Sequence, residues 1–356
     1  MRMLSLLVVV FLGCTPKDPD GEAPLVAQFG DPASFELTVI GDADALLDAP
    51  QDLDFNPERP GELWVVNRAN DDVVIFFDAG TDDQTSEQRK DVYGNHFMEE
   101  VSGIAFGAEG TFATSQDTRN TYDDMYQYND FMGPALWPSD LDIFATANQN
   151  NQLLGSHLDM LHESPWSMGI AHEVDNVYWV FDGLNSDLVR YDFGIDHGPG
   201  HDDHSDGIVR RYSEVELSRT AGVPGGMILD SEDSMLYIAD TGAGRILRVD
   251  ITTGEVAGPL TQLMEPLAEY SAMEGVEFEE LTSGFDSPTG IALTAEHVFV
   301  TERESGDIIA LNREGEEVDR ISTDAAAIAG LVVGPDEQLW YVDAENDEVV
   351  RVEPGE

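Results

Sequence analysis

Residues 236–250 read LYIADTGAGRILRVD, and this stretch decides the fold. An apolar segment ends at Asp240, a glycine-rich turn follows, and residues 245–250 then alternate between apolar and polar side chains. Two short strands on either side of such a turn are typical of a β-hairpin. The stretch therefore predicts a hairpin, and its recurrence along the chain determines the architecture.

The same pattern recurs at four other places in the chain. The stretches are LWVVNRANDDVVIFFD (63–78), VYWVFDGLNSDLVRYD (177–192), VFVTERESGDIIALN (298–312) and LWYVDAENDEVVRVE (339–353). A short strand built around a small residue precedes most hairpins, as in GIA at 169–171 and at 290–292. Small residues there are expected because inner strands crowd together around a propeller axis.

A sixth unit begins with GIAF at 103–106. Its hairpin starts at 111–114, is interrupted by an insertion, and is expected to resume near 141–144. Six units at a spacing of roughly 40–65 residues predict an all-β fold, a six-bladed β-propeller.

The two ends of the repeat region predict how the ring closes. The last unit stops after its third strand. The predicted strand FELTVI at 35–40 precedes the first unit and belongs to no repeat. Pairing 35–40 with 349–353 would complete the last blade and hide two sheet edges at once. We predict that pairing, and with it a single propeller domain over residues 34–356.

The repeats, especially YIADTGAGRI at 237–246, resemble the NHL-repeat family. The resemblance extends from about residue 35 to the end of the chain. It implies a six-bladed β-propeller, a fold that hosts enzymes and scaffolds alike.

The N-terminus has the features of a targeting segment. Arg2 precedes an apolar run, and FLGC at 11–14 resembles the bacterial lipobox. That resemblance implies a signal peptide over 1–13, lipidation of Cys14, and a flexible tether over 14–33. The alternative is an ordinary signal peptide with a stray cysteine. We expect a lipid-anchored protein of the bacterial cell envelope, in the periplasm or on the surface; Thr15 after Cys14 fits the outer-membrane pattern.

The charge balance excludes one class of partner. The chain has 71 acidic and 17 basic residues, a formal net charge of −54. Such a field repels nucleic acid, so we expect no nucleic-acid partner. The acidity suits a solvated surface in a salty medium, or alternatively a cation-rich partner.

Known catalytic fingerprints are missing from the sequence. It has no Gly-x-Ser-x-Gly elbow, P-loop or Rossmann motif, so we expect no nucleotide cofactor. The peptidyl-amidoglycolate lyases, which share the fold, have Pro-His pairs where inner strands begin. The corresponding pairs here lack the histidine: Pro50-Gln51, Pro224-Gly225 and Pro288-Thr289.

A first candidate site consists of His96, His162 and Arg219, which precede Gly103, Gly169 and Gly226 at matching offsets. The repeat predicts that these three side chains lie side by side near the axis on one face. Two imidazoles with nearby carboxylates could hold a transition metal or perform acid–base work. Alternatively, they only cap the starts of strands or contact solvent.

A second candidate is the loop DHGPGHDDHSDG at 196–207, which we expect on the opposite face. Its spacing resembles the start of a calcium loop, but no downstream Glu matches. Three histidines among carboxylates suit zinc, copper or nickel instead. His172 is expected on that face and could join them. Alternatively, the loop binds metal only opportunistically. The candidate ligands are His197, His201, Asp202, His204 and Asp206.

The hairpin turns share an acidic or amide residue that we interpret as structural, because such side chains accept hydrogen bonds from nearby backbone amides. These residues are Asn67, Asp182, Asp240, Glu302 and Asp343.

The sequence favours a binding or scaffolding propeller that presents loops to a protein, peptide or glycan, with a bound divalent metal (zinc, copper or calcium). One alternative is a metal-dependent hydrolase or lyase at the axial mouth near His96 and His162. Another is a metal sensor or carrier. We expect a monomer.

Overall fold

The computed structural model describes residues 35–354, except 109, 122–128, 149–152, 202 and 263–264. Cys14 and Asp202, two of the predicted functional residues, lie outside the described residues. Regular structure within them is almost entirely β, with one four-residue α-helix, α1 (Gly94–Phe97), and one short 3-10 helix, η3 (Ala43–Ala45). In this part of the chain no helix has the length and apolar character needed to cross a membrane.

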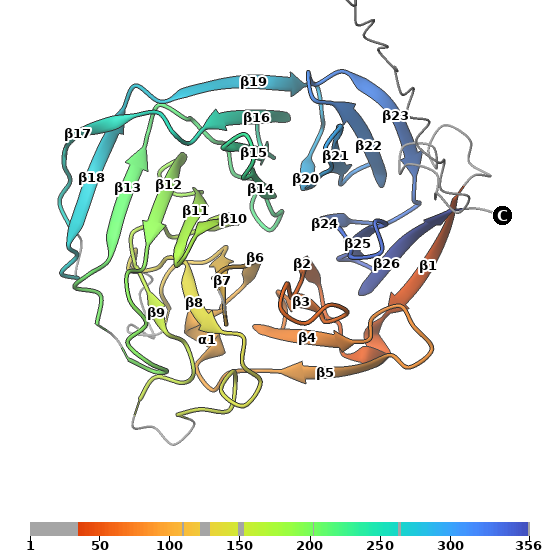
Figure 1. The fold of residues 1–356 in the computed structure, drawn as a ribbon, viewed down its shortest axis with the longest axis horizontal. Helices are drawn as coiled ribbons and strands as arrows, with labels where there is room; N and C mark the ends of the chain where they lie inside the picture. Colours follow the sequence, from red (N-terminus) through yellow and green to blue (C-terminus); the bar gives the residue numbers. More distant parts are fainter. Residues whose placement is uncertain are drawn as a thin grey trace, which may run out of the picture.

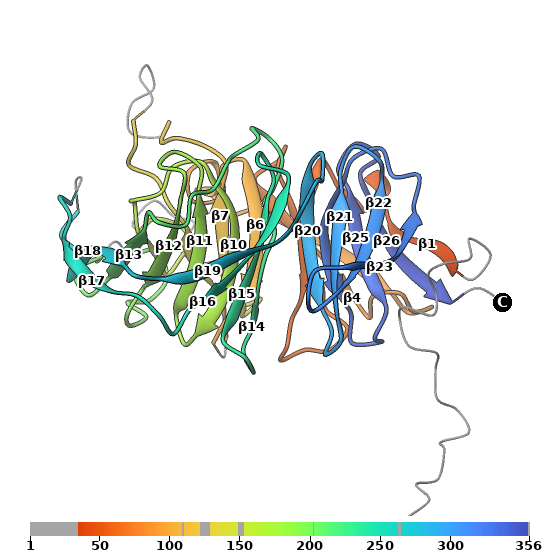
Figure 2. The ribbon, with the colours of Figure 1, turned by 90° about the horizontal axis from the view of Figure 1, so that it is seen from above.

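Six sheets surround a common axis, which confirms the predicted six-bladed β-propeller (Figure 1). The inner strands stand roughly along that axis, whereas the outer strands tilt away from it (Figure 2). Blade 1 comprises β2 (Pro50–Phe55), β3 (Leu63–Asn67), β4 (Asp72–Phe77) and β5 (Thr85–Arg89). Blade 2 comprises β6 (Val101–Phe106), β7 (Thr111–Gln116), β8 (Ala135–Pro138) and β9 (Asp159–Met160). Blade 5 comprises β20 (Pro288–Leu293), β21 (His297–Glu302), β22 (Asp307–Asn312) and β23 (Glu317–Ser322).

Blades 3 and 4 are interleaved in the sequence. Blade 3 begins with β10 (Ser167–Val174), β11 (Val177–Asp182), β12 (Asp187–Asp192) and β13 (Ile208–Tyr212). Blade 4 comprises β14 (Met227–Asp230), β15 (Met235–Asp240), β16 (Arg245–Asp250) and β19 (Glu277–Ser283). Between β16 and β19 the chain forms a hairpin, β17 (Glu255–Pro259) and β18 (Glu269–Glu274). Because β18 pairs in parallel with β13, this hairpin extends blade 3 rather than blade 4.

The ring closes as the sequence predicts. Blade 6 comprises β24 (Ile328–Val333), β25 (Leu339–Asp343) and β26 (Glu348–Pro354). The N-terminal strand β1 (Phe35–Gly41) pairs antiparallel with β26, with Phe35 opposite Pro354 and Leu37 opposite Val352. The earliest described strand therefore completes the last blade.

The third strand of blade 2 differs from the expectation. It is β8, not residues 141–144, which form turns. The fully buried Trp137 belongs to β8 and to the core of this blade. Phe144, also fully buried, packs its ring 5.4 Å from that of Trp64. The apolar character of 141–144 thus reflects a turn folded back onto the core.

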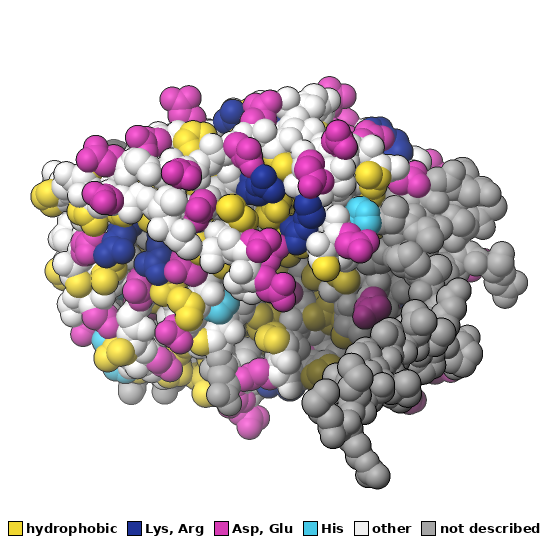
Figure 3. Space-filling view, turned by 45° about the horizontal axis from the view of Figure 1, so that its top comes forward, with side chains coloured by type: hydrophobic (Ala, Val, Ile, Leu, Met, Phe, Trp, Pro, Cys, Tyr) yellow, Lys and Arg dark blue, Asp and Glu magenta, His cyan; other side chains and the backbone are white. Residues whose placement is uncertain are grey.

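The small residues of the inner strands and the acidic residues of the hairpin turns have the structural roles that the sequence predicts. A Cβ on Gly169 would lie 1.9 Å from the carbonyl oxygen of Gly225, so only glycine permits this close approach of inner strands. Asp343 accepts hydrogen bonds from the amides of Ala326 and Ala327. Asp240 likewise accepts from Ser218. The structural interpretation of the turn acids is confirmed. Other acidic side chains are spread widely over the surface (Figure 3).

Candidate functional site

A buried group of histidines and carboxylates lies at the rim of the propeller, between blades 2 and 3. Asp159 belongs to β9, the outermost strand of blade 2, and His162 follows it. His204 lies in the loop before β13, and Glu265 in the segment between β17 and β18. Figure 1 shows β9, β13 and β18 at this rim. Three segments far apart in sequence therefore meet here.

Close contacts join these side chains into one cluster. The amide and Nδ1 of His162 lie 2.6 and 2.9 Å from the two carboxylate oxygens of Glu265. His204 Nδ1 lies 2.7 Å from Asp159 Oδ1, while its Nε2 lies 3.8 Å from Glu265 Oε2. One ligand atom each of His162, His204 and Glu265 falls within 4.8 Å of the other two. We call these three residues, with Asp159, the rim cluster.

The rim cluster is closed to solvent. The side chains of His162, His204 and Glu265 are only 4%, 10% and 2% exposed. Burial raises the pKa of Glu265 to about 7 and also raises that of Asp159. A buried carboxylate resists ionisation unless a positive charge lies beside it. A cation held here would supply that charge.

Aromatic rings pack around the cluster. Phe131 stacks on His162 with ring centroids 3.7 Å apart, and Phe97 stacks on His157 at 3.6 Å. Burial lowers the pKa of His157 to about 3, so this ring is neutral. His96 extends the row, with its ring centroid 6.1 Å from that of His162. The aromatic rings form an apolar wall that excludes water from the rim cluster.

The structure joins only two members of the first predicted site. His96 and His162 lie together at the rim, with ring centroids 6.1 Å apart, and not at the expected position near the axis. Arg219 instead donates to Asp117 and places its guanidinium 4.8 Å from the ring centre of Trp166. Arg219 stays apart from the two histidines because the buried Asp117 of blade 2 holds its guanidinium group.

The expected placement of the 196–207 loop was wrong. We expected it on the face opposite His162, yet the rings of His204 and His162 are 5.2 Å apart. The loop packs against the outer strand of blade 2, where the amide of Gly200 donates to the carbonyl of His157. The two sequence candidates therefore contribute to one cluster. His197, paired with Asp206 at 2.9 Å, and the exposed His201 take no part in it.

Sequence reasoning missed Glu265 and Asp159. Glu265 stands in MEPL at 264–267 and Asp159 in LDML at 158–161. A single acid in an apolar context hints at burial, since an unpaired charge there is costly. This pattern does not predict which side chain the buried acid contacts.

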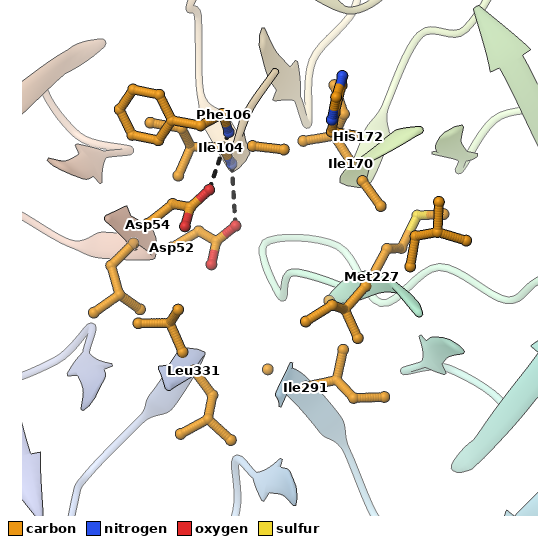
Figure 4. Close-up of a pocket in the computed structure, with 17 residues that line it drawn as sticks. Asp52, Asp54, Ile104, Phe106, Ile170, His172, Met227, Ile291 and Leu331 are labelled. Atoms are coloured by element: carbon orange, nitrogen blue, oxygen red, sulfur yellow. Dashed lines mark hydrogen bonds between the residues drawn. The ribbon is translucent and has the colours of Figure 1, made fainter. Parts of the chain in front are cut away.

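A second feature is a cavity of about 200 Å³ on the propeller axis, lined by the inner strands of all six blades (Figure 4). Asp52 and Asp54 face it and accept hydrogen bonds from the amides of Ile104 and Phe106, each at 3.0 Å. Burial raises the pKa of Asp52 to about 7 and that of Asp54 to about 6. Among the described lining residues the one histidine is His172, so the pair proposed for an axial site, His96 and His162, lies elsewhere.

Sequence comparison finds relatives that match part of this chain, and structure comparison finds proteins that share most of its fold. No family model matches the chain. An uncharacterized protein of Sulfolobus acidocaldarius is 29% identical over 137 residues, 38% of this chain and 46% of its own length. Regucalcin of Danio rerio is 29% identical over 100 residues, 28% of this chain and 30% of its own length. The chain thus matches less than half the length of either relative.

Solved structures share the fold at low identity. An auxiliary nutrient-binding protein from Bacteroides ovatus superposes with a TM-score of 0.58 at 12% identity, covering 91% of this chain and 78% of that one. A similar protein from Bacteroides thetaiotaomicron gives 0.52 at 12% identity, covering 86% and 69%. Virginiamycin B lyase from Staphylococcus aureus gives 0.51 at 12% identity, covering 90% and 99%. These neighbours support the six-bladed, NHL-like fold and nothing finer.

Proposed function

We propose that this protein is an anchored, extracytoplasmic binding module of a bacterial cell envelope. In this proposal the propeller presents its loops to a protein, peptide or glycan, and the rim cluster holds a divalent transition metal that fixes the loops of blades 2 and 3. The observation that carries the metal proposal is the convergence of His162, His204 and Glu265.

The chemistry of the donor set supports a metal of the zinc or copper class. Two imidazoles and one carboxylate suit those ions, whereas calcium takes oxygen ligands. Asp159 beside His204 Nδ1 matches the carboxylate that commonly orients a metal-binding histidine. Its second oxygen, Oδ2, is buried without a hydrogen-bond partner, and a nearby cation would offset the cost of burying this carboxylate.

Burial favours a structural rather than a catalytic metal. Structural sites are closed by protein ligands, while catalytic ones keep a position open to substrate. The three side chains are at most 10% exposed. A hydrolase or lyase at the rim cluster would need a route for substrate, and the cavity that the described residues enclose on the axis is lined by none of the three.

The binding role and location rest on other observations. Two fold neighbours are nutrient-binding proteins of Bacteroides, and a binding role for this chain follows by analogy of fold. The lipobox-like segment ending at Cys14 supports an envelope location, with the propeller tethered to the membrane. The charge of −54 supports a strongly hydrated surface.

The metal proposal is tested by measuring metal content. The protein is purified without a histidine tag, and zinc, copper, nickel and calcium are measured by mass spectrometry. We expect one equivalent of zinc or copper in the wild type and in His172→Gln. The metal should be lost in His204→Gln and in Glu265→Gln.

Two further results separate the alternatives. Retention of the metal in a His197→Gln/His201→Gln double variant would exclude the exposed part of the loop as the ligand. Absence of stoichiometric metal from the wild type, even after incubation with each ion, would overturn the metal proposal and leave a metal-free binding propeller.

A further inference from the structure

The mouth of the propeller axis is built around a backbone hydrogen bond that recurs in five of the six blades. In five blades the residue after the second strand donates its backbone N–H to the carbonyl of the segment that leads into the first strand. The five residues are Arg68, Asp117, Gly183, Arg303 and Ala344, with N···O distances of 3.0 to 3.2 Å. These residues therefore share one face, opposite the end of the inner strands where His172 lies. We call this face the arginine mouth.

Three arginines gather at the arginine mouth. Arg68 comes from blade 1, and its Nη1 lies 3.2 Å from Asp117 Oδ2. Arg219, from the segment entering blade 4, donates to the other oxygen of Asp117. A Cβ on Gly183 would lie 2.4 Å from Arg219 Cδ, so the missing side chain leaves the room that Arg219 occupies. The buried Asp117 thus holds Arg68 and Arg219 in place from two sides.

Arg303, from blade 5, differs from every other arginine in the described part of the chain. Each of the other described arginines forms an ion pair with at least one acidic side chain. The Arg303 side chain forms neither an ion pair nor a hydrogen bond with the described residues, and its Nη1 atom is buried. With 71 acidic residues in the sequence, an arginine left without a carboxylate is unexpected. A guanidinium nitrogen that is buried without an acceptor, as Nη1 of the partly buried Arg303 is, costs free energy.

The surroundings of Arg303 explain why no carboxylate among the described residues pairs with it. Asp343, the nearest turn acid of blade 6, uses both oxygens on backbone amides and on Asn346. Burial lowers the pKa of Arg303, and the positive charge of Arg68 lowers it further. The negative charges of Glu304, Asp343 and Glu345 raise this pKa, but less than burial lowers it. Arg68 and Arg303 follow the second strands of blades 1 and 5 at equivalent positions, so both side chains begin at the same mouth of the propeller.

We propose that the arginine mouth binds an oxyanion, a carboxylate or phosphate group of a small ligand, through Arg303, with Arg68 and Arg219 as the neighbouring guanidinium groups at the same mouth. A guanidinium matches either group with two parallel hydrogen bonds. This inference names a ligand class for the proposed binding role and is independent of a metal in the rim cluster. The field of the whole chain repels anions, so this local cluster is what would select one.

Trp166 provides a reporter at this mouth. It is the one tryptophan of five that is not fully buried, and the guanidinium groups of Arg219 and Arg119 lie over its ring at 4.8 and 5.6 Å. A ligand that draws Arg219 toward the axis changes the stacking and hence the fluorescence of Trp166. The signal is thus local to the proposed site.

The test measures binding of galacturonate, galactose and inorganic phosphate by calorimetry and by tryptophan fluorescence at low ionic strength. Galacturonate and galactose differ by the carboxylate, and phosphate tests the other source of an oxyanion. We expect galacturonate, phosphate or both to bind, galactose not to bind, and affinity to fall with added salt. Arg303→Gln should weaken binding about tenfold or more, since it removes a charge-assisted pair of hydrogen bonds. The control is Arg320→Gln, an exposed arginine on β23, which should bind as wild type.

Circular dichroism shows whether each variant is folded. If Arg303→Gln is misfolded, Arg303→Lys, which keeps the charge but not the fork, should bind more weakly than wild type. Failure of all three probes to bind the folded wild type, or equal binding by wild type and folded Arg303→Gln, would overturn the proposal. Neither result would bear on the rim cluster, because metal content is measured separately.

Discussion

The rim cluster and the axial cavity both bury carboxylates, but they satisfy them in different ways. At the axis, Asp52 and Asp54 accept hydrogen bonds from backbone amides of the next blade, which the repeat itself supplies. At the rim, Asp159 faces the imidazole of His204, which comes from a loop, and Glu265, carried by an inserted hairpin, faces the imidazole of His162. Buried acids in regular strands thus find partners in the repeat, whereas acids at the rim depend on side chains from outside it. Among the described residues, only at the rim do carboxylates and imidazoles meet in an arrangement that could bind a metal ion.

The largest expected effect comes from breaking the His204–Asp159 pair. His204→Ala removes the partner of a carboxylate whose side chain is 2% exposed. Removal of one partner from a buried pair lowers the free energy of unfolding by about 3–5 kcal/mol. Urea denaturation of the metal-free protein measures this loss.

The double variant His204→Ala/Asp159→Asn provides the control. Because asparagine carries no charge, it should recover about half of the stability lost in the single variant. A single variant as stable as wild type would show that the rim cluster contributes nothing beyond packing.

The axial cavity should respond to pH instead. Asp52 has an ordinary pKa of 3.8 that burial raises to about 7 in the folded protein. The folded state therefore binds the proton more tightly than the unfolded chain, and wild type loses stability as pH rises from about 4 to about 7. Asp52→Asn avoids this loss, so it should be more stable than wild type by on the order of 2–4 kcal/mol at pH 8.

Urea denaturation of wild type and Asp52→Asn from pH 4 to pH 8 checks this difference. The stability gap should close as pH falls toward 4. Asp54→Asn should show a smaller gap, because burial raises the pKa of Asp54 only to about 6. A gap that is independent of pH would mean that Asp52 stays ionised in the folded protein.

The smallest effect is expected for the axial histidine. His172 lines the cavity, but it is only partly buried and its Nε2 contacts the carbonyl of Asp175. His172→Gln should change the free energy of unfolding by less than about 1 kcal/mol. A loss comparable to that of His204→Ala would remove the contrast between the two regions.

Most of the fold could be predicted from the sequence because of its repeats. The hairpin pattern predicted six blades, and the unassigned strand at 35–40 predicted how the ring closes. Both depend on local periodicity, which a sequence displays directly. Blade 2 was harder because the apolar side chains at 141–144 look like a strand, yet residues 135–138 form it.

The rim cluster could be predicted only in part. His162 and His204 stood out because the chain has eight histidines among 356 residues. Their meeting depends on a loop folding back over blade 2, and Glu265 arrives on a hairpin that leaves blade 4 to join blade 3. Such long-range packing leaves no periodic signal in the sequence. Arg219 was misplaced for the same reason, since the buried Asp117 governs its direction.

The pairing of β1 with β26 has a consequence for how the chain folds during synthesis. Thr38 and Glu353 contact each other across 315 residues, so the strand made first waits for the strand made last. At about 5–20 residues per second, that delay is roughly 15–60 s. Throughout it, β1 is an edge without a neighbour, and the ring stays open. Assembly of the propeller is therefore a late, slow event that favours a chaperone able to cover that edge until β26 is available.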